Sequence, residues 1–397
     1  MTPPILSIVI PAFNEEAGIA AIVERTLAAR EGLCRSAGLG EVEVIVVDDG
    51  STDRTAEIAR GVTGVTLLSH PRNRGYGAAI KTGFARARGE LLGFLDADGT
   101  CDPAFFAELC RTLLAEQADV VIGARLGAGS AMPAPRRLGN RLFAAVLNLS
   151  GTGRVTDSAS GMRVLRRDAL PRLYPLPDGM HFTPAMSSLA LFDPRLRIRE
   201  VPMPYHERTG LSKLHPVRDG LRFLRIILET ALTYRPLRLL GAVGLAILAL
   251  GAAYGAGPVA FYLAEGHLEE RMIYRLVAVA VAMTTGINLV AVGLLGQQAV
   301  GLIHGDFTPP RGFRRWLDRV LHRFLVPWGM LAILAGVALN WSSLVEYATT
   351  RQITAHWIYV LTGGLLVTIG VEFISFGVMA RALTILAARK SFGREET

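Results

Sequence analysis

The sequence contains little cysteine, and it does not begin with a long apolar segment. Its three cysteines, Cys34, Cys101 and Cys110, lie apart and form no metal-ligand pattern. A disulfide framework is therefore not expected, and the first part of the chain is predicted to lie in a reducing compartment. Because no basic stretch followed by an apolar core opens the sequence, no cleaved signal peptide is predicted.

The excess of positive charge is also small. A formal net charge of +8 over 397 residues does not indicate a nucleic-acid partner. The charged residues are concentrated in residues 1–238, whereas the remainder is mostly apolar. Basic residues stand beside the apolar stretches, as is typical of a protein at an anionic membrane surface. The chain is long enough for two domains, of which the second is predicted to lie in a membrane.

Short apolar runs alternate with helical patterns in the first half of the chain. The expected strands are residues 6–10, 42–47, 65–69, 91–95 and 119–122. The expected helices are residues 19–29, 54–60 and 103–115, together with one that follows residues 73–78 and ends at about residue 88. Asn14, Glu15 and Glu16 are expected to begin the first helix, and Ser51 or Asp53 to cap the second. This alternation predicts a doubly wound, mainly parallel α/β sheet.

The strand at residues 91–95 runs directly into Asp96-Ala97-Asp98. Ligands of parallel sheets bind just beyond the carboxyl ends of the strands, and alternation points both carboxylates to one side. Two carboxylates so placed suit a hard divalent cation that also holds phosphate oxygens. The alternative is a solvated turn at the end of a strand.

Five motifs occur in an order that resembles a known family. They are SIVIPAFNEE, VIVVDDGSTD, NRGYGAA, LDADG and TDSASGMRV. Together they resemble family 2 glycosyltransferases of the GT-A fold over roughly residues 5–215, especially polyprenyl-phosphate glycosyltransferases and dolichyl-phosphate mannose synthases. The glycine-rich motif lacks the third glycine and the following acidic residue of a dinucleotide fingerprint, so NAD binding is not expected.

The resemblance implies where the donor nucleotide binds. Pro11, Glu15 and Asp49 would hold the nucleoside, and Asp48 belongs to the same acidic strand end. For Glu15 the alternative is helix capping.

The resemblance also implies that Asp96 and Asp98 bind the diphosphate and its metal, Mg²⁺ or Mn²⁺. Where dolichyl-phosphate mannose synthases often have D-A-D-L-Q, this chain has Gly99-Thr100 after the aspartates. Water or Thr100 would then complete the metal shell.

Two further segments are assigned to the acceptor by the resemblance. Asp157 is the candidate base or acceptor-orienting carboxylate, and Arg163 is a phosphate or structural partner; the alternative is an Asp-Ser turn beside a surface arginine. Arg208, Ser212 and Lys213 lie in a segment that resembles the R-x-G-x-S-K loop of polyprenyl-phosphate glycosyltransferases, which receives the acceptor phosphate.

An all-α membrane domain of four helices is predicted after this loop. Residues 1–214 form the glycosyltransferase domain, residues 215–236 an amphipathic interfacial helix and linker, and residues 237–397 the membrane domain. The predicted spans are about 239–263, 276–303, 324–345 and 357–380, and each exceeds the roughly 20 residues that cross a bilayer.

The distribution of arginine predicts how these spans are oriented. The loop between the second and third spans contains five arginines: Arg311, Arg314, Arg315, Arg319 and Arg323. The catalytic domain and both termini are therefore predicted to be cytoplasmic. Glu372, inside the last span, is unusual for a membrane helix.

These observations favour an inverting transfer of one sugar from a UDP- or GDP-linked donor to a polyprenyl phosphate. Membrane lipids are further expected partners, and the sequence is compatible with a homo-oligomer. A processive polysaccharide synthase is the first alternative, but Gly312 stands where its Q-x-x-R-W motif needs glutamine before Arg315-Trp316. The second alternative is a lipid transporter with a regulatory soluble domain.

Overall fold

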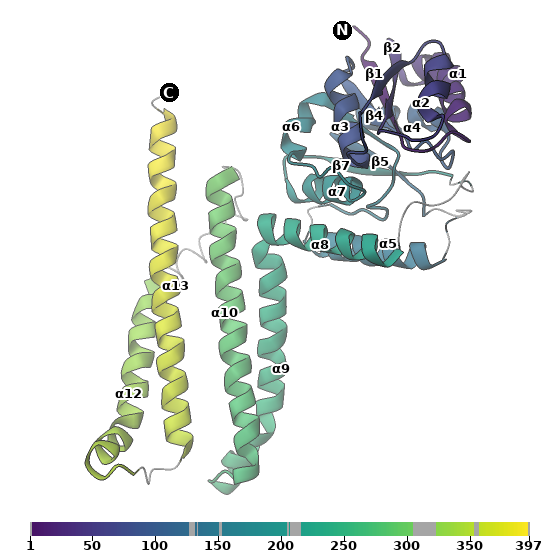
Figure 1. Cartoon of the computed structure of the whole chain (residues 1–397). Coiled ribbons are helices and arrows are strands. Elements are labelled where there is room, and N and C mark those ends of the chain that lie inside the picture. The colour runs from purple at the N-terminus through teal and green to yellow at the C-terminus, as the bar shows by residue number, and fades with distance from the viewer. Residues whose placement is uncertain are drawn as a thin grey trace. The chain divides into compact units, whose positions relative to one another are not determined.

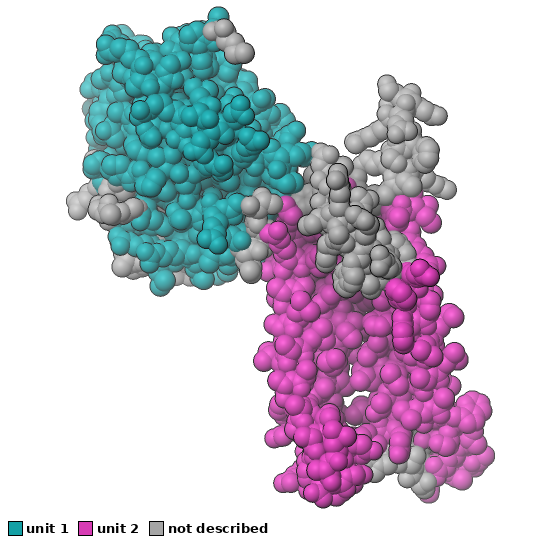
Figure 2. All heavy atoms as spheres, turned by 180° about the vertical axis from the view of Figure 1, so that it is seen from behind, with its two compact units in different colours: residues 1–231 teal, residues 232–397 magenta. Residues whose placement is uncertain are grey.

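The computed structural model divides the chain into two compact units, residues 1–231 and 232–397 (Figure 2). It describes residues 2–126, 132, 134–150, 153–204, 206, 216–304, 323–352 and 357–395.

A seven-stranded sheet forms the centre of the first unit (Figure 1). The strands are β1 (Ile5–Ala12), β2 (Glu41–Asp48), β3 (Thr66–Ser69), β4 (Leu91–Phe94), β5 (Val120–Ala124), β6 (Arg163–Arg166) and β7 (Ile198–Pro202). Their order is β3-β2-β1-β4-β6-β5-β7, and β6 alone of them runs antiparallel to its neighbours. The predicted mainly parallel α/β sheet is confirmed, whereas β6 and β7 were not predicted.

The sheet is covered by helices on both faces because its central strands are apolar on both sides. The helices are α1 (Ile19–Ala37), α2 (Thr55–Gly61), α3 (Tyr76–Arg86), η1 (Pro103–Phe105), α4 (Phe106–Ala115), α5 (Ala134–Ser150), η2 (Arg167–Ala169), α6 (Leu170–Leu173) and α7 (Phe182–Phe192). Ile8 and Ile10 of β1 share a core cluster with residues of α1 and α4. Val9 points the other way, toward Gly83 of α3. Alternation along one strand thus packs both helical layers.

The first helix begins at Ile19, as its expected range has it, but residues 14–16 do not form its first turn. α1 starts at Ile19, and the N–H groups of Gly18 and Ile19 both donate to the Glu15 carbonyl in the preceding turn. Asn14 has a left-handed φ of 51°, which is incompatible with a helical start at that residue. Residues 14–16 are instead bound to another segment of the chain, as described below.

The amphipathic helix α8 (Pro216–Tyr234) packs largely on the first unit. Phe223 and Ile227 are buried, and the ring of Phe223 lies 6.0 Å from that of Phe143 in α5. Leu221, on another side of the helix, is 63% exposed. The side of the helix that faces the protein is therefore set by Phe223 and Ile227, whereas Leu221 points away from the protein.

The described residues of the second unit include four helices that are long and apolar enough to cross a membrane, as predicted. They are α9 (Pro236–Glu265), α10 (Ile273–His304, preceded by η3, Glu270–Met272), α12 (Leu325–Thr350) and α13 (Trp357–Glu395). α9 packs on α10 where a Cβ at Gly244 would stand 2.8 Å from the Gly286 carbonyl, which allows the backbones to approach closely. Between α10 and α13, Asn288 Nδ2 donates to Glu372 Oε1 at 2.6 Å.

Candidate active site

Three neighbouring parallel strands, β1, β2 and β4, end at one edge of the sheet. The predicted donor-binding residues follow these ends: Asp48 closes β2, Asp49 comes next, and Asp96 and Asp98 follow β4. Asp48, Asp49 and Asp98 are buried and Asp96 is half-buried. The topology therefore places four carboxylates at the edge where open α/β sheets bind ligands.

Pro11 lies inside β1 without interrupting the sheet. Leu95 N–H donates to the Val9 carbonyl on the β4 side, and Asp49 N–H donates to the Ala12 carbonyl on the β2 side. Because successive backbone groups alternate in direction, the position of the missing N–H of Pro11 faces the β4 side. Pairing between β1 and β4 has ended at Val9 there. The proline thus lies where β1 no longer donates a backbone hydrogen bond to β4.

The first two motifs bind each other through hydrogen bonds. The backbone N–H groups of residues 14–16 donate in turn to Ser51 Oγ (2.9 Å), Thr55 Oγ1 (2.8 Å) and Asp53 Oδ2 (3.2 Å). In return, the Asn14 side chain accepts a backbone N–H of the second motif at 2.8 Å. These bonds hold the ends of β1 and β2 in one arrangement and leave the half-buried Glu15 side chain at the same place.

Asp53, expected as a possible cap of the second helix, stands one residue before the N-cap of α2, which is Arg54. Its Oδ1 accepts the backbone N–H of Thr55 at 3.0 Å and the hydroxyl of the same residue. Burial opposes ionisation, but these hydrogen bonds together lower the pKa of Asp53. The side chain therefore orders the start of α2.

Asp49 fixes the glycine-rich loop that precedes α3. Its Oδ1 accepts the Arg74 N–H at 2.9 Å, and its Oδ2 accepts the Gly75 N–H at 2.8 Å. His70 Nδ1 lies 2.7 Å from Asp49 Oδ1, and His70 Nε2 lies 2.9 Å from Thr82 Oγ1. His70 is a site residue that the sequence did not reveal, since a lone histidine after a strand has no pattern. Its buried contact identifies it.

Asp96 and Asp98 are held by different partners. Asp98 Oδ1 accepts the Thr100 N–H at 3.1 Å and the Thr100 hydroxyl at 2.7 Å. Asp96 Oδ1 accepts the Tyr76 hydroxyl at 2.6 Å. Thr100 thus holds Asp98 directly.

The donor chemistry here fits a divalent cation that shares a diphosphate. Among the described residues no three His, Cys, Asp or Glu side chains gather into a complete metal shell. Mg²⁺ and Mn²⁺ sites of nucleotide enzymes use one or two carboxylates, with phosphate oxygens and water as the other ligands. Two hard carboxylates at the end of β4 are such a partial set.

Asp157 is fully buried and forms an ion pair with Arg125. Arg125 Nε donates to Oδ2 at 2.7 Å, Arg125 Nη2 donates to Oδ1 at 2.8 Å, and Asn140 Nδ2 of α5 donates to Oδ1 at 2.6 Å. Burial alone would raise the pKa of Asp157, but the arginine and the hydrogen bonds lower it to about 2. A carboxylate with so low a pKa is a weak base, so Asp157 is better suited to orienting its neighbours than to removing a proton.

Arg163, at the start of β6, is also fully buried. Its Nη1 donates to Ser187 Oγ at 2.9 Å, and its Nε and Nη2 donate to the carbonyls of Ser160 (3.0 Å) and Ser158 (2.8 Å). Burial lowers the pKa of Arg163 to about 10, although nearby Asp157 opposes that change. Of the two roles that the sequence left open, these contacts support the structural one, because the guanidinium holds residues 158–160 and is not exposed to an acceptor.

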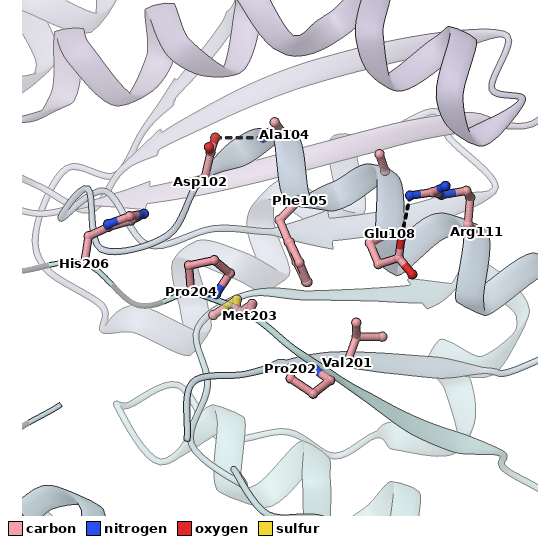
Figure 3. A pocket seen from close by; sticks show the side chains of 11 residues that line it. Asp102, Ala104, Phe105, Glu108, Arg111, Val201, Pro202, Met203, Pro204 and His206 are labelled. Atoms are coloured by element: carbon pink, nitrogen blue, oxygen red, sulfur yellow. Dashed lines mark hydrogen bonds and ion pairs between the residues drawn. The ribbon is translucent and has the colours of Figure 1, made fainter. Parts of the chain in front are cut away.

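The expected acceptor loop lies outside the described residues, as do Arg208, Ser212 and Lys213. A groove of about 600 Å³ lies beside the point where the chain leaves β7 (Figure 3). It is lined by side chains of η1, α4 and β7, including Phe105, and by Met203, Pro204 and His206 of the segment after β7. The His206 N–H donates to the Thr100 carbonyl at 3.0 Å, which connects this groove to the residue that holds Asp98.

Two family models match the chain. Residues 7–173 match "Glycosyl transferase family 2", and residues 236–393 match a domain of unknown function (DUF8752). The first match covers the carboxylate edge and the second covers the four long helices.

Some curated relatives extend the likeness beyond the first unit. The chain is 37% identical over 235 residues to the low-salt glycan biosynthesis hexosyltransferase Agl6 of Haloferax volcanii. This match covers 58% of this chain and 55% of Agl6. The chain thus spans about half the length of that relative. It is 32% identical over 328 residues to the undecaprenyl-phosphate 4-deoxy-4-formamido-L-arabinose transferase of Pseudomonas fluorescens, covering 80% of this chain and 89% of the relative. The corresponding transferase of Pseudomonas paraeruginosa is 30% identical over 324 residues, with 80% and 90% covered.

Solved structures are more distant. Glucosyl-3-phosphoglycerate synthase of Mycobacterium tuberculosis, crystallised with Mn²⁺, UDP and phosphoglyceric acid, is 26% identical with a TM-score of 0.43, covering 58% of this chain and 78% of the synthase. The matches to the family model and to transferases along nine-tenths of their length lead to one conclusion: the chain belongs to glycosyl transferase family 2.

Proposed function

We propose that this protein transfers one sugar, with inversion, from a UDP- or GDP-linked donor to a polyprenyl phosphate at the cytoplasmic face of a membrane. The observation that carries the proposal is the length of the likeness to transferases named for undecaprenyl phosphate. A match of 324 residues exceeds the 231 residues of the first unit, so it takes in parts of both units.

The donor nucleotide is assigned to the carboxyl ends of β1 and β2. Pro11, Glu15, Asp48 and Asp49 would hold the nucleoside, and carboxylate oxygens there can accept hydrogen bonds from a base or a ribose. The bonds between the first two motifs support this role, because they fix the backbone that presents these groups. A preorganised site loses less conformational entropy when the nucleotide binds.

The diphosphate is assigned to the end of β4. A Mg²⁺ or Mn²⁺ ion held by Asp96 and Asp98 would neutralise the charge that develops on the departing nucleoside diphosphate. The protein contributes by keeping both carboxylates in place, Asp98 through Thr100 and Asp96 through Tyr76.

The acceptor phosphate would attack the anomeric carbon in line with the departing diphosphate. A phosphate monoester has a second pKa of about 6, so it is largely ionised at neutral pH and needs no strong base. This agrees with the ion pair of Asp157 and Arg125, which suits Asp157 for orienting the acceptor segment. Arg208, Ser212 and Lys213 would bind the phosphate group itself at the membrane surface.

Transfer of a radiolabelled sugar distinguishes this proposal from the two alternatives. Membranes containing the protein are incubated with labelled nucleotide sugars and a polyprenyl phosphate, and Asp98→Asn serves as the inactive reference. Label in chloroform-soluble lipid supports single-sugar transfer, whereas label in a polymer supports a processive synthase. Absence of label with every UDP- and GDP-sugar tested would contradict enzymatic transfer and favour a transporter.

A further inference from the structure

The hydroxyl of Tyr76 is directed at the first aspartate of the Asp96-Ala97-Asp98 motif. Tyr76 is the first residue of α3, and its hydroxyl donates to Asp96 Oδ1 at 2.6 Å. The ring packs edge-on against Phe182 with centroids 6.4 Å apart, and Phe182 packs in the same way on Phe94 of β4 at 5.9 Å. An aromatic wall thus fixes the position from which the hydroxyl reaches the carboxylate.

Gly161 confines the same carboxylate from another direction. A Cβ built on Gly161 would overlap Asp96 Oδ2, so only a residue without a side chain fits beside the aspartate. Gly161 comes from the segment that precedes β6, whereas Tyr76 comes from α3. Two independent parts of the fold therefore restrict one carboxylate to one arrangement.

The loop that delivers Tyr76 is fixed as well. Asp49 accepts the N–H groups of Arg74 and Gly75, the two residues immediately before the tyrosine. Gly75 has a φ of 105°, a conformation that residues with side chains rarely adopt. The backbone conformation at residue 75 thus places the Tyr76 hydroxyl beside Asp96.

The Tyr76 hydroxyl is a neutral donor, because a phenol is ordinarily protonated at neutral pH. A neutral phenol facing a carboxylate forms a hydrogen bond to a charged acceptor, which is stronger than one between neutral groups.

We propose that Tyr76 is a positioning residue that holds the Asp96 carboxylate in the orientation in which it binds a divalent cation and the donor diphosphate. This inference rests on the proposed function, since it assigns a role within that donor site. It goes beyond the sequence motif, which presents NRGYGAA as a glycine-rich loop and gives the tyrosine no part in cation binding.

The test is Tyr76→Phe in the purified full-length protein. Binding of Mn²⁺ is measured from the loss of the free-ion electron paramagnetic resonance signal, first with Mn²⁺ alone and then with UDP or GDP present. We expect Mn²⁺ to bind roughly tenfold more weakly to the variant, the effect of losing one hydrogen bond to a charged group. In sugar transfer, the KM for Mn²⁺ should rise by a similar factor while kcat at saturating Mn²⁺ stays near the wild-type value.

Matched variants separate this role from simple loss of structure. Tyr174→Phe removes a hydroxyl from a tyrosine that is 40% exposed, and it should leave Mn²⁺ binding unchanged. Gly161→Ala should weaken Mn²⁺ binding as Tyr76→Phe does, because it displaces Asp96 from the opposite side. Asp96→Asn gives the reference for loss of the carboxylate itself.

Two results would overturn the inference. One is unchanged Mn²⁺ affinity in Tyr76→Phe, and the other is absence of Mn²⁺ binding to the wild-type protein with either nucleotide. The Mn²⁺ measurement involves no lipid acceptor. If the wild-type protein binds Mn²⁺ and Tyr76→Phe weakens that binding, the inference is supported even when no sugar is transferred to lipid. The absence of transfer would then count against the proposed function alone.

Discussion

Replacement of Asp157 by asparagine should lower the stability of the first unit. Its effect should not be limited to the loss of a catalytic base. The Asp157 side chain is 0% exposed and that of Arg125 is 14% exposed. An asparagine Nδ2 in the place of Oδ2 would face the Arg125 N–H and Nε donors, which now bond at 3.0 and 2.7 Å. Breaking such a buried pair costs about 3 kcal/mol of unfolding free energy, and for a unit of this size we expect Tm to fall by about 6–12 °C.

The positions of two residue types make this unit separately measurable. All three cysteines occur in residues 34–110, whereas all four tryptophans occur in residues 316–357. A thiol-reactive dye on heating therefore reports exposure of buried Cys101 and Cys110 in the first unit, and tryptophan fluorescence reports on the second. Replacing the half-buried Cys34 by serine removes the background reaction.

Controls and pH dependence sharpen this prediction. Glu57→Gln, which removes a largely exposed ion pair with Arg54, should change Tm little. The folded pKa of Asp157, about 2, lies below the ordinary value of 3.8. Its stabilising contribution, roughly 2 kcal/mol, is therefore complete above pH 4 and is lost as the pH falls through 2. The difference in stability between the wild type and Asp157→Asn should shrink over that acid range alone.

A double replacement tests the ion pair itself. Asp157→Asn combined with Arg125→Gln should be no less stable than Asp157→Asn alone, because the second change removes the uncompensated buried charge. If Asp157→Asn instead melted like the wild type while sugar transfer disappeared, the ion-pair reasoning would be refuted and a role as base supported.

Three further outcomes are expected. Asp98→Ala should abolish transfer without lowering the Tm of either unit, and wild-type turnover unaffected by exhaustive chelation would contradict a metal role. A single cysteine at Glu269 should react with an impermeant thiol reagent outside the cell and one at Gly312 should not; the opposite pattern would reverse the proposed orientation. Arg208→Ala with Lys213→Ala should cripple transfer at limiting polyprenyl phosphate but preserve nucleotide binding, and near-normal transfer would indicate that these cations only contact lipid.

The fold of the first unit could largely be predicted because its central strands are continuous apolar runs. β1, β2 and β4 are buried on both faces, so they carry a strong signal, and their order along the chain fixed which acidic residues share an edge. β6 is only RVLR, with an arginine at each end, and β7 is a short strand with charged residues inside it. Neither shows an apolar run, since β6 buries Arg163 through hydrogen bonds that appear only after folding.

Side-chain partners were beyond what the sequence could predict. Asp157 and Arg125 are 32 positions apart, and Tyr76 and Asp96 are 20 apart, so no local pattern joins them. The same is true of His70, 21 positions from Asp49. Motif order identified which carboxylates matter, whereas the groups that orient them depend on how separate loops meet at the edge of the sheet.

The hydrogen bond between Asn288 and Glu372 has a consequence for biosynthesis. A carboxylate that entered hydrocarbon without a partner would add roughly 3 kcal/mol to the insertion free energy of α13. Ribosomes make α10 well before α13, so in a chain that inserts in order Asn288 would reach the membrane before Glu372, its partner in the folded chain. The hydrogen-bond donor for the Glu372 carboxylate is thus made before the carboxylate itself. When α13 is expressed without α9 and α10, it should integrate into the membrane less efficiently than the same helix carrying Glu372→Leu.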